Sequence, residues 1–242
     1  MLNFLRQLRR KNMNSKYLKY AVGEIVLVVI GILIALSINN WSEASKEKKF
    51  ERKMLSQVHL ALKNDIEYFE NNFQRLYNLD SSIVVFLNLI NQKAPFIDSL
   101  YDQDRGRWYY LATGIIYQYN PGPYEALKAT GVDKITNEEL RNELVMLYDF
   151  EFPRHKEFIM YYDQDYKKQT DQLFAFQSEP FLKQVEGEIR VYRKFPTNLL
   201  RDHDFLLMLN NMKSRAEIQS RAFRNFIPNL YKVDSLLRNE LN

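Results

Sequence analysis

The chain has 242 residues, with 34 Lys and Arg, 30 Asp and Glu, 3 His and no Cys. This length supports a hydrophobic core without covalent cross-links, and 7 Gly and 7 Pro are too few for a loop-rich all-β or a disordered chain. The absence of Cys excludes disulfide frameworks, thiolate metal sites and Cys nucleophiles. The net charge of +4 is compatible with a nucleic-acid-binding protein, so the positions of the charges are decisive.

The excess positive charge lies in a short N-terminal arm. Residues 1–23 hold six basic residues and no acidic one, whereas the rest of the chain holds 28 basic and 30 acidic residues. The six are Arg6, Arg9, Arg10, Lys11, Lys16 and Lys19. Because the rest of the chain carries no excess of positive charge, we do not expect nucleic acid as a partner.

An apolar run follows the arm. The 17 residues from Ile25 to Trp41 carry no charge, and the run extends back to Tyr20 with Glu24 as its single charged residue. About 20 helical residues span the roughly 30 Å of a bilayer's hydrocarbon core, so we predict a transmembrane helix over residues 20–41. The small residues of Ala35-Leu36-Ser37 leave a cleaved signal peptide as the alternative. The apolar run is longer than a signal-peptide core, which favours an uncleaved anchor.

Positive charges near the span predict its orientation. Six basic residues precede the run, and residues 42–53 contain five. The positive-inside rule then predicts a cytoplasmic arm over residues 1–19, with most of the chain outside the cytoplasm. We therefore expect a single-pass protein of a bacterial inner membrane with a periplasmic C-terminal domain. A 19-residue arm is too short for an output domain such as a kinase, so a signal would have to pass through a partner membrane protein.

One face of the predicted span combines a charge with small residues. Glu24, Gly31 and Ala35 share this face at about 100° per residue. Gly31 and Ala35 form a small-xxx-small pair that lets two helices approach closely, and a charge within a span usually has a partner. This pattern predicts a homo-oligomer or a partner membrane protein. In the alternative, Glu24 lies at the interface and reaches back toward the basic arm, and the small residues occur there by chance.

The remaining chain is predicted to be helical. Mostly apolar residues at spacings of three and four from Leu55 to Leu76 indicate a helical stalk and the first bundle helices over residues 42–94, with residues 78–82 as a candidate break. Residues 95–136 are rich in Gly and Pro and predict a turn-rich insert. Within it we expect a short helix over residues 108–117 and another over 124–130, the second ended by Gly131 in a left-handed conformation.

Residues 95–242 are expected to complete the helical domain. Thr136 and Glu139 resemble a capping box, and Pro153 is expected to start a helix that ends near residue 176. Further helices are predicted over residues 180–192 and 203–241, with Asp202 as an N-cap and Pro228 as a kink or break. No segment shows sustained period-two alternation. We therefore predict an all-α fold: one N-terminal transmembrane helix followed by a mostly extracytoplasmic bundle of long helices with a turn-rich insert.

The segment GEIVLVVIGILIALSINNW (Gly23 to Trp41), preceded by the basic arm, resembles a family of single-pass membrane proteins of Bacteroidota that is known as a domain of unknown function. Pro123 to Gly131, followed by Ile135, Leu140, Leu144 and Tyr148, resembles the middle segment of the same family. The resemblance implies a membrane location. It implies no activity, substrate or catalytic residue.

Catalytic and metal-binding patterns are absent from the sequence. His59, His155 and His203 are far apart, and neither an H-E-x-x-H nor an E-x-x-H motif occurs. No nucleophile elbow, phosphate-binding loop or dinucleotide fingerprint occurs. We expect a protein that is not an enzyme and that needs no metal or cofactor.

Aromatic residues of the turn-rich insert are the remaining signal. They are candidates for a patch that recognises a peptide, a glycan or a small apolar ligand, and the alternative is an aromatic-rich core with hydroxyls at the surface. The candidates are Trp108, Tyr109, Tyr110, Tyr117, Tyr119 and Tyr124. We thus predict a membrane-anchored scaffold or interaction module that acts through a partner membrane protein, with a ligand-sensing periplasmic domain as the alternative.

Overall fold

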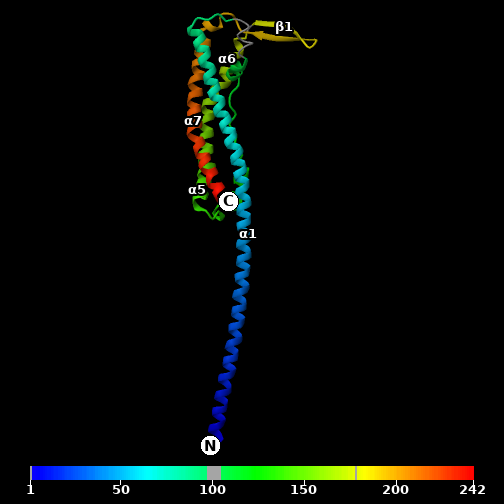
Figure 1. Ribbon diagram of the computed structural model, residues 1–242, viewed down its shortest axis with the longest axis vertical. Helices are drawn as coiled ribbons and strands as arrows, with labels where there is room; N and C mark the ends of the chain where they lie inside the picture. The colour runs from blue at the N-terminus through cyan, green and yellow to red at the C-terminus, as the bar shows by residue number, and fades with distance from the viewer. Residues whose placement is uncertain (1, 97–104, 178) are drawn as a thin grey trace. The chain divides into compact units, whose positions relative to one another are not determined.

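Helices form most of the computed structural model, which describes residues 2–96, 105–177 and 179–242 (Figure 1). The chain divides into two units, Met1–Lys53 and Met54–Asn242. The predicted all-α class is confirmed, with one small two-stranded sheet in the described residues as its exception. The helical elements are α1 (Leu2–Asn91), α3 (Arg105–Ala112), α4 (Gly122–Thr130), η1 (Val132–Lys134), α5 (Glu138–Val145), η2 (Met146–Glu151), α6 (Phe152–Ala175), η3 (Leu199–Arg201) and α7 (His203–Leu241).

The first unit consists of the N-terminal part of α1. Its apolar residues between Tyr20 and Trp41 are exposed, and α1 is long and apolar enough to span a membrane near the N-terminus. The many β-branched residues of this run still form a helix, because a helix satisfies its own backbone hydrogen bonds in lipid.

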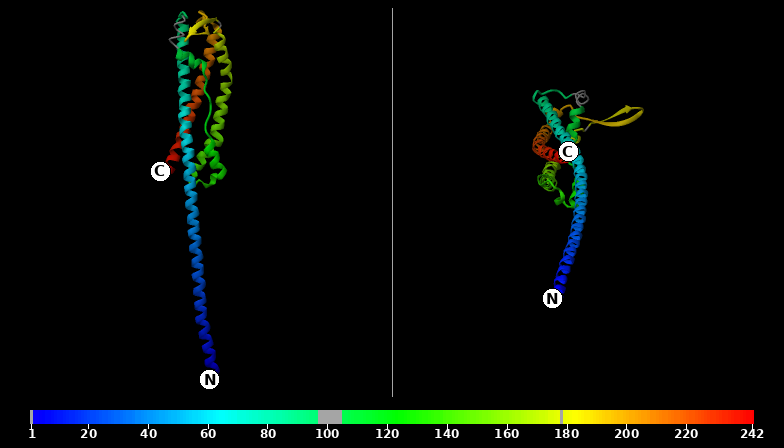
Figure 2. Two further views of the ribbon diagram at one scale, coloured as in Figure 1. Left: turned by 90° about the vertical axis from the view of Figure 1, so that its right-hand side faces the viewer. Right: turned by 60° about the horizontal axis from the view of Figure 1, so that its bottom comes forward.

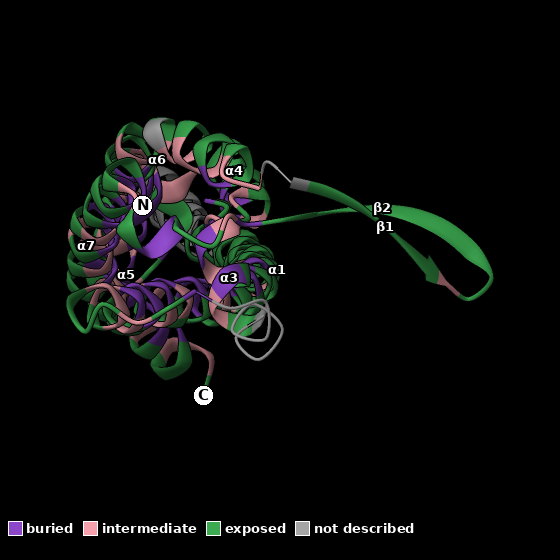
Figure 3. Ribbon diagram, turned by 90° about the horizontal axis from the view of Figure 1, so that it is seen from above, coloured by how far each residue is buried: buried purple, intermediate pink, exposed green. Residues whose placement is uncertain are grey.

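The second unit is a bundle in which α1 from Met54 onward, α6 and α7 lie side by side (Figure 2). Its core has two clusters of buried hydrophobic residues. The first contains the α1 residues from Met54 to Leu76, together with residues of α4, α5, η2, α6 and the C-terminal half of α7. The second contains the α1 residues from Leu79 to Phe86, together with residues of α3, η3 and the N-terminal half of α7. Buried residues face inward in the view along the bundle (Figure 3).

Three sites of predicted helix interruption are continuous in the structure. The candidate break at residues 78–82 lies within α1, where Ser82 Oγ donates to the Asn78 carbonyl at 2.7 Å. Pro228 lies inside α7, which is not broken. Pro153 is the second residue of α6, but the preceding residues form the π-helical turn η2, so that α5, η2 and α6 follow one another without a loop. A proline needs no backbone N–H at a helix start, and neighbouring bonds carry a long helix across one proline.

Two further local predictions are corrected. The N-cap of α5 is Asn137 and not Thr136, since the Asn137 side chain accepts a hydrogen bond from the Leu140 amide at 3.1 Å. The predicted helix over residues 108–117 ends at Ala112, and residues 113–121 form neither helix nor strand. By contrast, the Asp202 N-cap is confirmed, because its side chain accepts from the amides of Asp204 and Phe205. Gly131 ends α4 with a positive φ of 106°, but its ψ of 107° lies outside the predicted left-handed helical region.

Polar side chains of α1 hold the irregular segment 113–121 against the bundle. This segment has no strand partner in the described residues, so its backbone groups need other partners. The polar row of α1, at spacings of three and four, supplies them. Tyr68 and Asn72 donate to the Ile116 carbonyl, Arg75 donates to the carbonyls of Thr113 and Gly114, and Asp65 accepts from the Asn120 amide. The polar row is Asp65, Tyr68, Asn72 and Arg75.

Residues 179–194 form a β-hairpin and not the predicted helix. Strand β1 (Glu179–Val185) pairs antiparallel with β2 (Glu188–Lys194), and Glu186 and Gly187 connect them with φ of 53° and 85°. Two adjacent positive φ values are typical of the tight turn that suits the twist of two paired strands. Ile189 and Val191 alternate with Arg190 and Tyr192, so the expectation of no period-two pattern is wrong here. The hairpin projects from the bundle with exposed faces (Figure 3).

Candidate functional site: an aromatic cavity at the base of the hairpin

A cavity of about 670 Å³ lies where the hairpin meets α3 and the C-terminal end of α6. This volume is within the range of about 300–1,000 Å³ that is usual for small-molecule sites. Four parts of the second unit contribute side chains, and most of these are aromatic. The lining residues of this aromatic cavity are Phe96, Trp108, Tyr109, Ala112, Leu173, Phe174, Gln177, Phe181, Lys183, Tyr192, Arg193, Lys194 and Phe195.

Buried rings form the floor of the aromatic cavity. The Trp108 and Phe195 rings stack with their centroids 4.3 Å apart and an angle of 23° between their planes. Phe96 meets both rings edge-on, at centroid distances of 6.2 Å and 6.1 Å. All three rings belong to the second core cluster and are buried. Stacked and edge-on packing of this kind fixes the floor before any ligand arrives.

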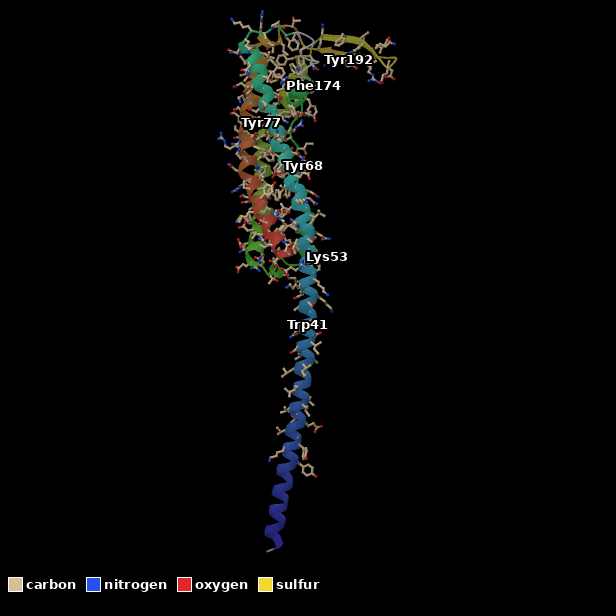
Figure 4. The ribbon with its side chains drawn as sticks, in the orientation of Figure 1. Trp41, Lys53, Tyr68, Tyr77, Phe174 and Tyr192 are labelled. Atoms are coloured by element: carbon tan, nitrogen blue, oxygen red, sulfur yellow. The ribbon has the colours of Figure 1, made fainter. Side chains whose placement is uncertain are left out.

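Partly exposed rings form the rim. Tyr109 comes from α3, Phe174 from α6, Phe181 from β1 and Tyr192 from β2, and all four are exposed by more than a third of their surface. Phe181 and Tyr192 are directly paired across the hairpin, with ring centroids 5.8 Å apart. Phe174 and Tyr192 are labelled at this end of the bundle in Figure 4. Exposed apolar rings around a hollow mark a binding site more often than isolated surface rings do.

The charges at the aromatic cavity have one sign. Lys183, Arg193 and Lys194 line it, and none of the described lining residues is acidic. Lys183 lies directly opposite Arg190 in the strand register. Like charges at directly opposed positions destabilise an antiparallel pair. Arg190 has a counter-ion in Glu188 at 3.2 Å, and Glu188 is not a lining residue.

Arg75 connects the rim to the polar row of α1. Its guanidinium lies 5.0 Å from the centroid of the Tyr109 ring and 5.9 Å from that of Tyr110. The same guanidinium donates to the carbonyls of Thr113 and Gly114 at 3.1 Å and 2.7 Å. A cation held by hydrogen bonds over an aromatic ring restricts that ring, so Arg75 positions Tyr109 at the rim.

The six aromatic residues predicted as one patch do not share one surface. Trp108 and Tyr109 line the aromatic cavity. Tyr110, the next residue on α3, is half-buried, and its hydroxyl accepts a hydrogen bond from Asn78 Nδ2 at 3.1 Å. Only two of the six therefore lie at the aromatic cavity.

The other three predicted patch residues lie in or against the first core cluster. Tyr117 is buried, and Tyr119 stacks on Phe152 with centroids 4.2 Å apart. Tyr124 is 0% exposed, and its hydroxyl donates to an Asp149 carboxylate oxygen at 3.1 Å. Burial and, second to it, the neighbouring Asp149 carboxylate raise the pKa of Tyr124 well above its ordinary value, so this hydroxyl stays protonated. Tyr117, Tyr119 and Tyr124 therefore belong to the aromatic-rich core that was the alternative to a binding patch.

Asp65 and His155 are also buried in the first core region. Burial raises the pKa of Asp65 from 3.8 to about 6, against the opposing effect of its hydrogen bond from the Asn120 amide. Burial lowers the pKa of His155 from 6.5 to about 4, and its Nδ1 lies 3.0 Å from the Tyr117 hydroxyl. Neither group lines the aromatic cavity, so they bear on stability and not on ligand contact.

The described residues contain no group of three or more His, Asp or Glu side chains placed to hold a metal ion. His59 pairs with Asp234 at 3.0 Å, and His203 is the first residue of α7. No set of nucleophile, base and orienting group lines the aromatic cavity among the residues that the structure describes.

The predicted membrane face lies in the first unit. Glu24, Gly31 and Ala35 are exposed on α1, and a Cβ added at Gly31 meets no atom within 4 Å. Space is thus available for a close helix neighbour at this face, as the small-xxx-small pair requires.

Sequence reasoning missed most residues of the aromatic cavity. The predicted helix over residues 180–192 includes Phe181, Lys183 and Tyr192, and a helix would hold Phe181 and Tyr192 about three turns apart instead of side by side. The detectable signal was the alternation in β2, with a Gly at the turn. Phe96, Phe174 and Phe195 carried no comparable signal, because they flank elements whose packing was not predictable.

The fold and the aromatic cavity define a helical protein with an apolar N-terminal helix and a binding hollow. The chain belongs to the family of unknown function DUF6090, whose model matches residues 24–185. The matched range begins at Glu24 in the apolar helix and ends at the last residue of β1. Neither the curated proteins nor the solved structures contain a match to the chain.

Proposed function

We propose that this protein is a non-enzymatic, membrane-anchored module that binds a ligand in the aromatic cavity and acts through a partner membrane protein. The aromatic cavity is the observation that carries the proposal. It combines a packed floor, partly exposed rings and one sign of charge, which is the combination expected of a recognition site.

A single tryptophan makes the binding test direct. The sequence has 2 Trp, Trp41 and Trp108, so Trp41→Phe leaves Trp108 at the cavity floor as the only tryptophan. The full-length Trp41→Phe chain in nonionic detergent is titrated with panels of metabolites, glycans and short peptides. We expect at least one class to change Trp108 emission and to raise the melting temperature, since ligands that bind the folded state stabilise it.

A variant that fills the cavity provides the control. Ala112 lines the aromatic cavity, and Ala112→Phe places a ring in it. Ligands of the cavity should lose their effect in this variant, whereas ligands that adsorb to detergent or to other surfaces should not. Panels without a single compound that distinguishes the two proteins would refute the ligand-binding proposal.

The anchor is proposed to be a single span of a bacterial inner membrane, with the basic arm in the cytoplasm and the second unit in the periplasm. The exposed apolar run of α1, the basic residues that precede it and the resemblance to single-pass proteins of Bacteroidota support this topology. A reporter that is active only in the periplasm, fused to the C-terminus, should be active. An active cytoplasmic reporter at the same position would refute the orientation.

The face formed by Glu24, Gly31 and Ala35 is proposed to contact a second helix. Because the chain has no Cys, a single introduced Cys gives an unambiguous crosslink in native membranes. Val28→Cys lies on this face, and we expect it to form disulfide-linked dimers or to crosslink a partner. Gly31→Leu should reduce that crosslink.

The matched control for Gly31→Leu is Ser37→Leu. Residue 37 is also small and exposed, and it lies roughly 140° around the helix from Glu24. Ser37→Leu should therefore leave the Val28→Cys crosslink unchanged. Equal crosslinking in both variants would count against the predicted face and leave the cavity proposal untouched.

A further inference from the structure

We propose that the aromatic cavity selects a small organic anion with a planar aromatic body. This inference rests on the proposed ligand-binding function and specifies the chemistry of the ligand. Its basis is the distribution of rings and charges around the hollow, both of which come from described residues of the second unit.

The aromatic rings that line the cavity indicate a ligand with a planar aromatic body. The floor presents the stacked Trp108 and Phe195 rings, and Phe96 meets them edge-on. A flat aromatic ligand extends such an arrangement by offset stacking or edge contact, which adds about 0.5–1.5 kcal/mol per ring pair beyond the burial of area. The rim rings Phe174 and Phe181 cover the sides of such a body.

The basic side chains that line the cavity indicate that the ligand carries a negative charge. Lys183 and Arg193 line the aromatic cavity, and neither side chain has an ion pair or a hydrogen bond in the part of the chain that the structure describes. Lys194 adds a third positive charge to the lining. An anion beside these groups gains charge-assisted hydrogen bonds, whereas a cation is repelled.

The strand register provides an independent reason. Lys183 and Arg190 are directly opposed, which destabilises the hairpin through repulsion. An isolated two-stranded hairpin is marginally stable in water. Glu188 pairs with Arg190 at 3.2 Å, but Lys183 has no counter-ion among the described residues. A bound anion next to Lys183 supplies one. Ligand binding is then coupled to the stability of the hairpin.

Three probes with one aromatic body test the inference. They are 2-naphthoate, the neutral 2-naphthalenemethanol and the cationic 2-naphthylmethylammonium, and binding is measured by Trp108 emission of the full-length Trp41→Phe chain in nonionic detergent. Naphthoate is expected to bind about tenfold more tightly than the alcohol, and the ammonium more weakly than the alcohol. The preference for naphthoate should decline as salt rises, because salt screens exposed charges over about 10 Å at 0.1 M.

Charge-neutralising variants identify the source of the preference. Lys183→Gln and Arg193→Gln should each lower the affinity for naphthoate severalfold and leave the affinity for the alcohol unchanged. Lys63→Gln removes an exposed charge from α1 that does not line the cavity, and it should change neither affinity. Ala112→Phe should abolish the response to all three probes, which separates binding in the cavity from partition into micelles.

Each outcome discriminates between the two proposals. A preference for naphthoate that disappears in Lys183→Gln supports the anionic class. Equal affinity for the three probes overturns the anionic class but leaves the ligand-binding function standing. No response to any probe overturns the aromatic-anion inference, and the proposed function then depends on the separate panel of metabolites, glycans and peptides.

Discussion

Asp65 and His155 are expected to give opposite pH dependences to the stability of the second unit. Asp65 is 6% exposed and has a folded pKa of about 6, against an ordinary value of 3.8. Between these two pH values the folded chain keeps a proton that the unfolded chain releases, so stability falls as pH rises through the window. A difference of about two pKa units lowers the free energy of unfolding by about 3 kcal/mol, and this full loss is reached above pH 6, where the buried carboxylate is charged.

His155 acts in the opposite direction over nearly the same range. Its folded pKa is about 4, against an ordinary value of 6.5. Between these two pH values the unfolded chain binds a proton that the folded chain does not bind. Stability therefore falls as pH drops from 6.5 to 4, again by about 3 kcal/mol. In the native sequence the two effects offset each other between about pH 4 and pH 6.5.

Single substitutions should reveal the separate contributions of Asp65 and His155 to the pH dependence of stability. Asp65→Asn keeps an oxygen for the Asn120 amide and removes the charge, so its stability relative to the native residue should rise by about 3 kcal/mol between pH 4 and pH 7. His155→Asn should show the opposite trend, and the double variant should restore the flat profile. The full-length Trp41→Phe chain is unfolded in urea at several pH values, with Trp108 emission as the signal.

The comparison with the native chain cancels the titration of all other groups, because they are the same in each variant. A stability difference for Asp65→Asn that stays constant from pH 4 to pH 7 would refute the reasoning. It would mean that the carboxylate is solvated in the folded chain or that its proton is not linked to unfolding.

Three other substitutions test a close contact and a hydrogen bond in the same urea assay. Gly114→Ala should destabilise the second unit by about 1–3 kcal/mol, because the new Cβ lies 2.7 Å from the Tyr166 ring. Gly106→Ala is the control: its Cβ meets no atom within 4 Å, so it should be neutral or stabilising by up to about 1 kcal/mol. Equal effects of the two substitutions would contradict the close contact at Gly114. Tyr124→Phe should cost about 1 kcal/mol through the lost bond to Asp149, and a variant as stable as the native chain would show that this bond is exchanged freely with water.

The apolar helix and much of the core could be predicted from the sequence because hydrophobic periodicity is a local signal. Leu55, Val58, Leu62 and Leu76 follow a helical spacing, and all are buried in the first cluster. Asp65 lies on the same face, where a polar residue breaks the pattern. It accepts a bond from the segment 113–121, a long-range partner that no local pattern reveals.

The hairpin and the aromatic cavity could not be derived in the same way. Adjacent apolar residues such as Phe181 and Leu182 mask the alternation of β1, and Pro180 is as suitable for the first turn of a helix as for an edge strand. Tyr109 and Tyr124 are chemically alike, but one is 55% exposed at the rim and the other is 0% exposed in the core. Only the packing of distant elements distinguishes them.

The turn of the hairpin links these local conformations to binding. Glu186 and Gly187 have φ of 53° and 85°, so Gly187→Ala forces a side chain into a conformation that costs about 1 kcal/mol. If the hairpin is marginally stable, that cost reduces the population able to bind, and the affinity for naphthoate should fall about fivefold. Glu186→Asn, which favours the same turn, should not reduce it. An unchanged affinity in Gly187→Ala would show that contacts at the base of the hairpin order it independently of its turn, and the coupling of ligand binding to hairpin stability would be wrong.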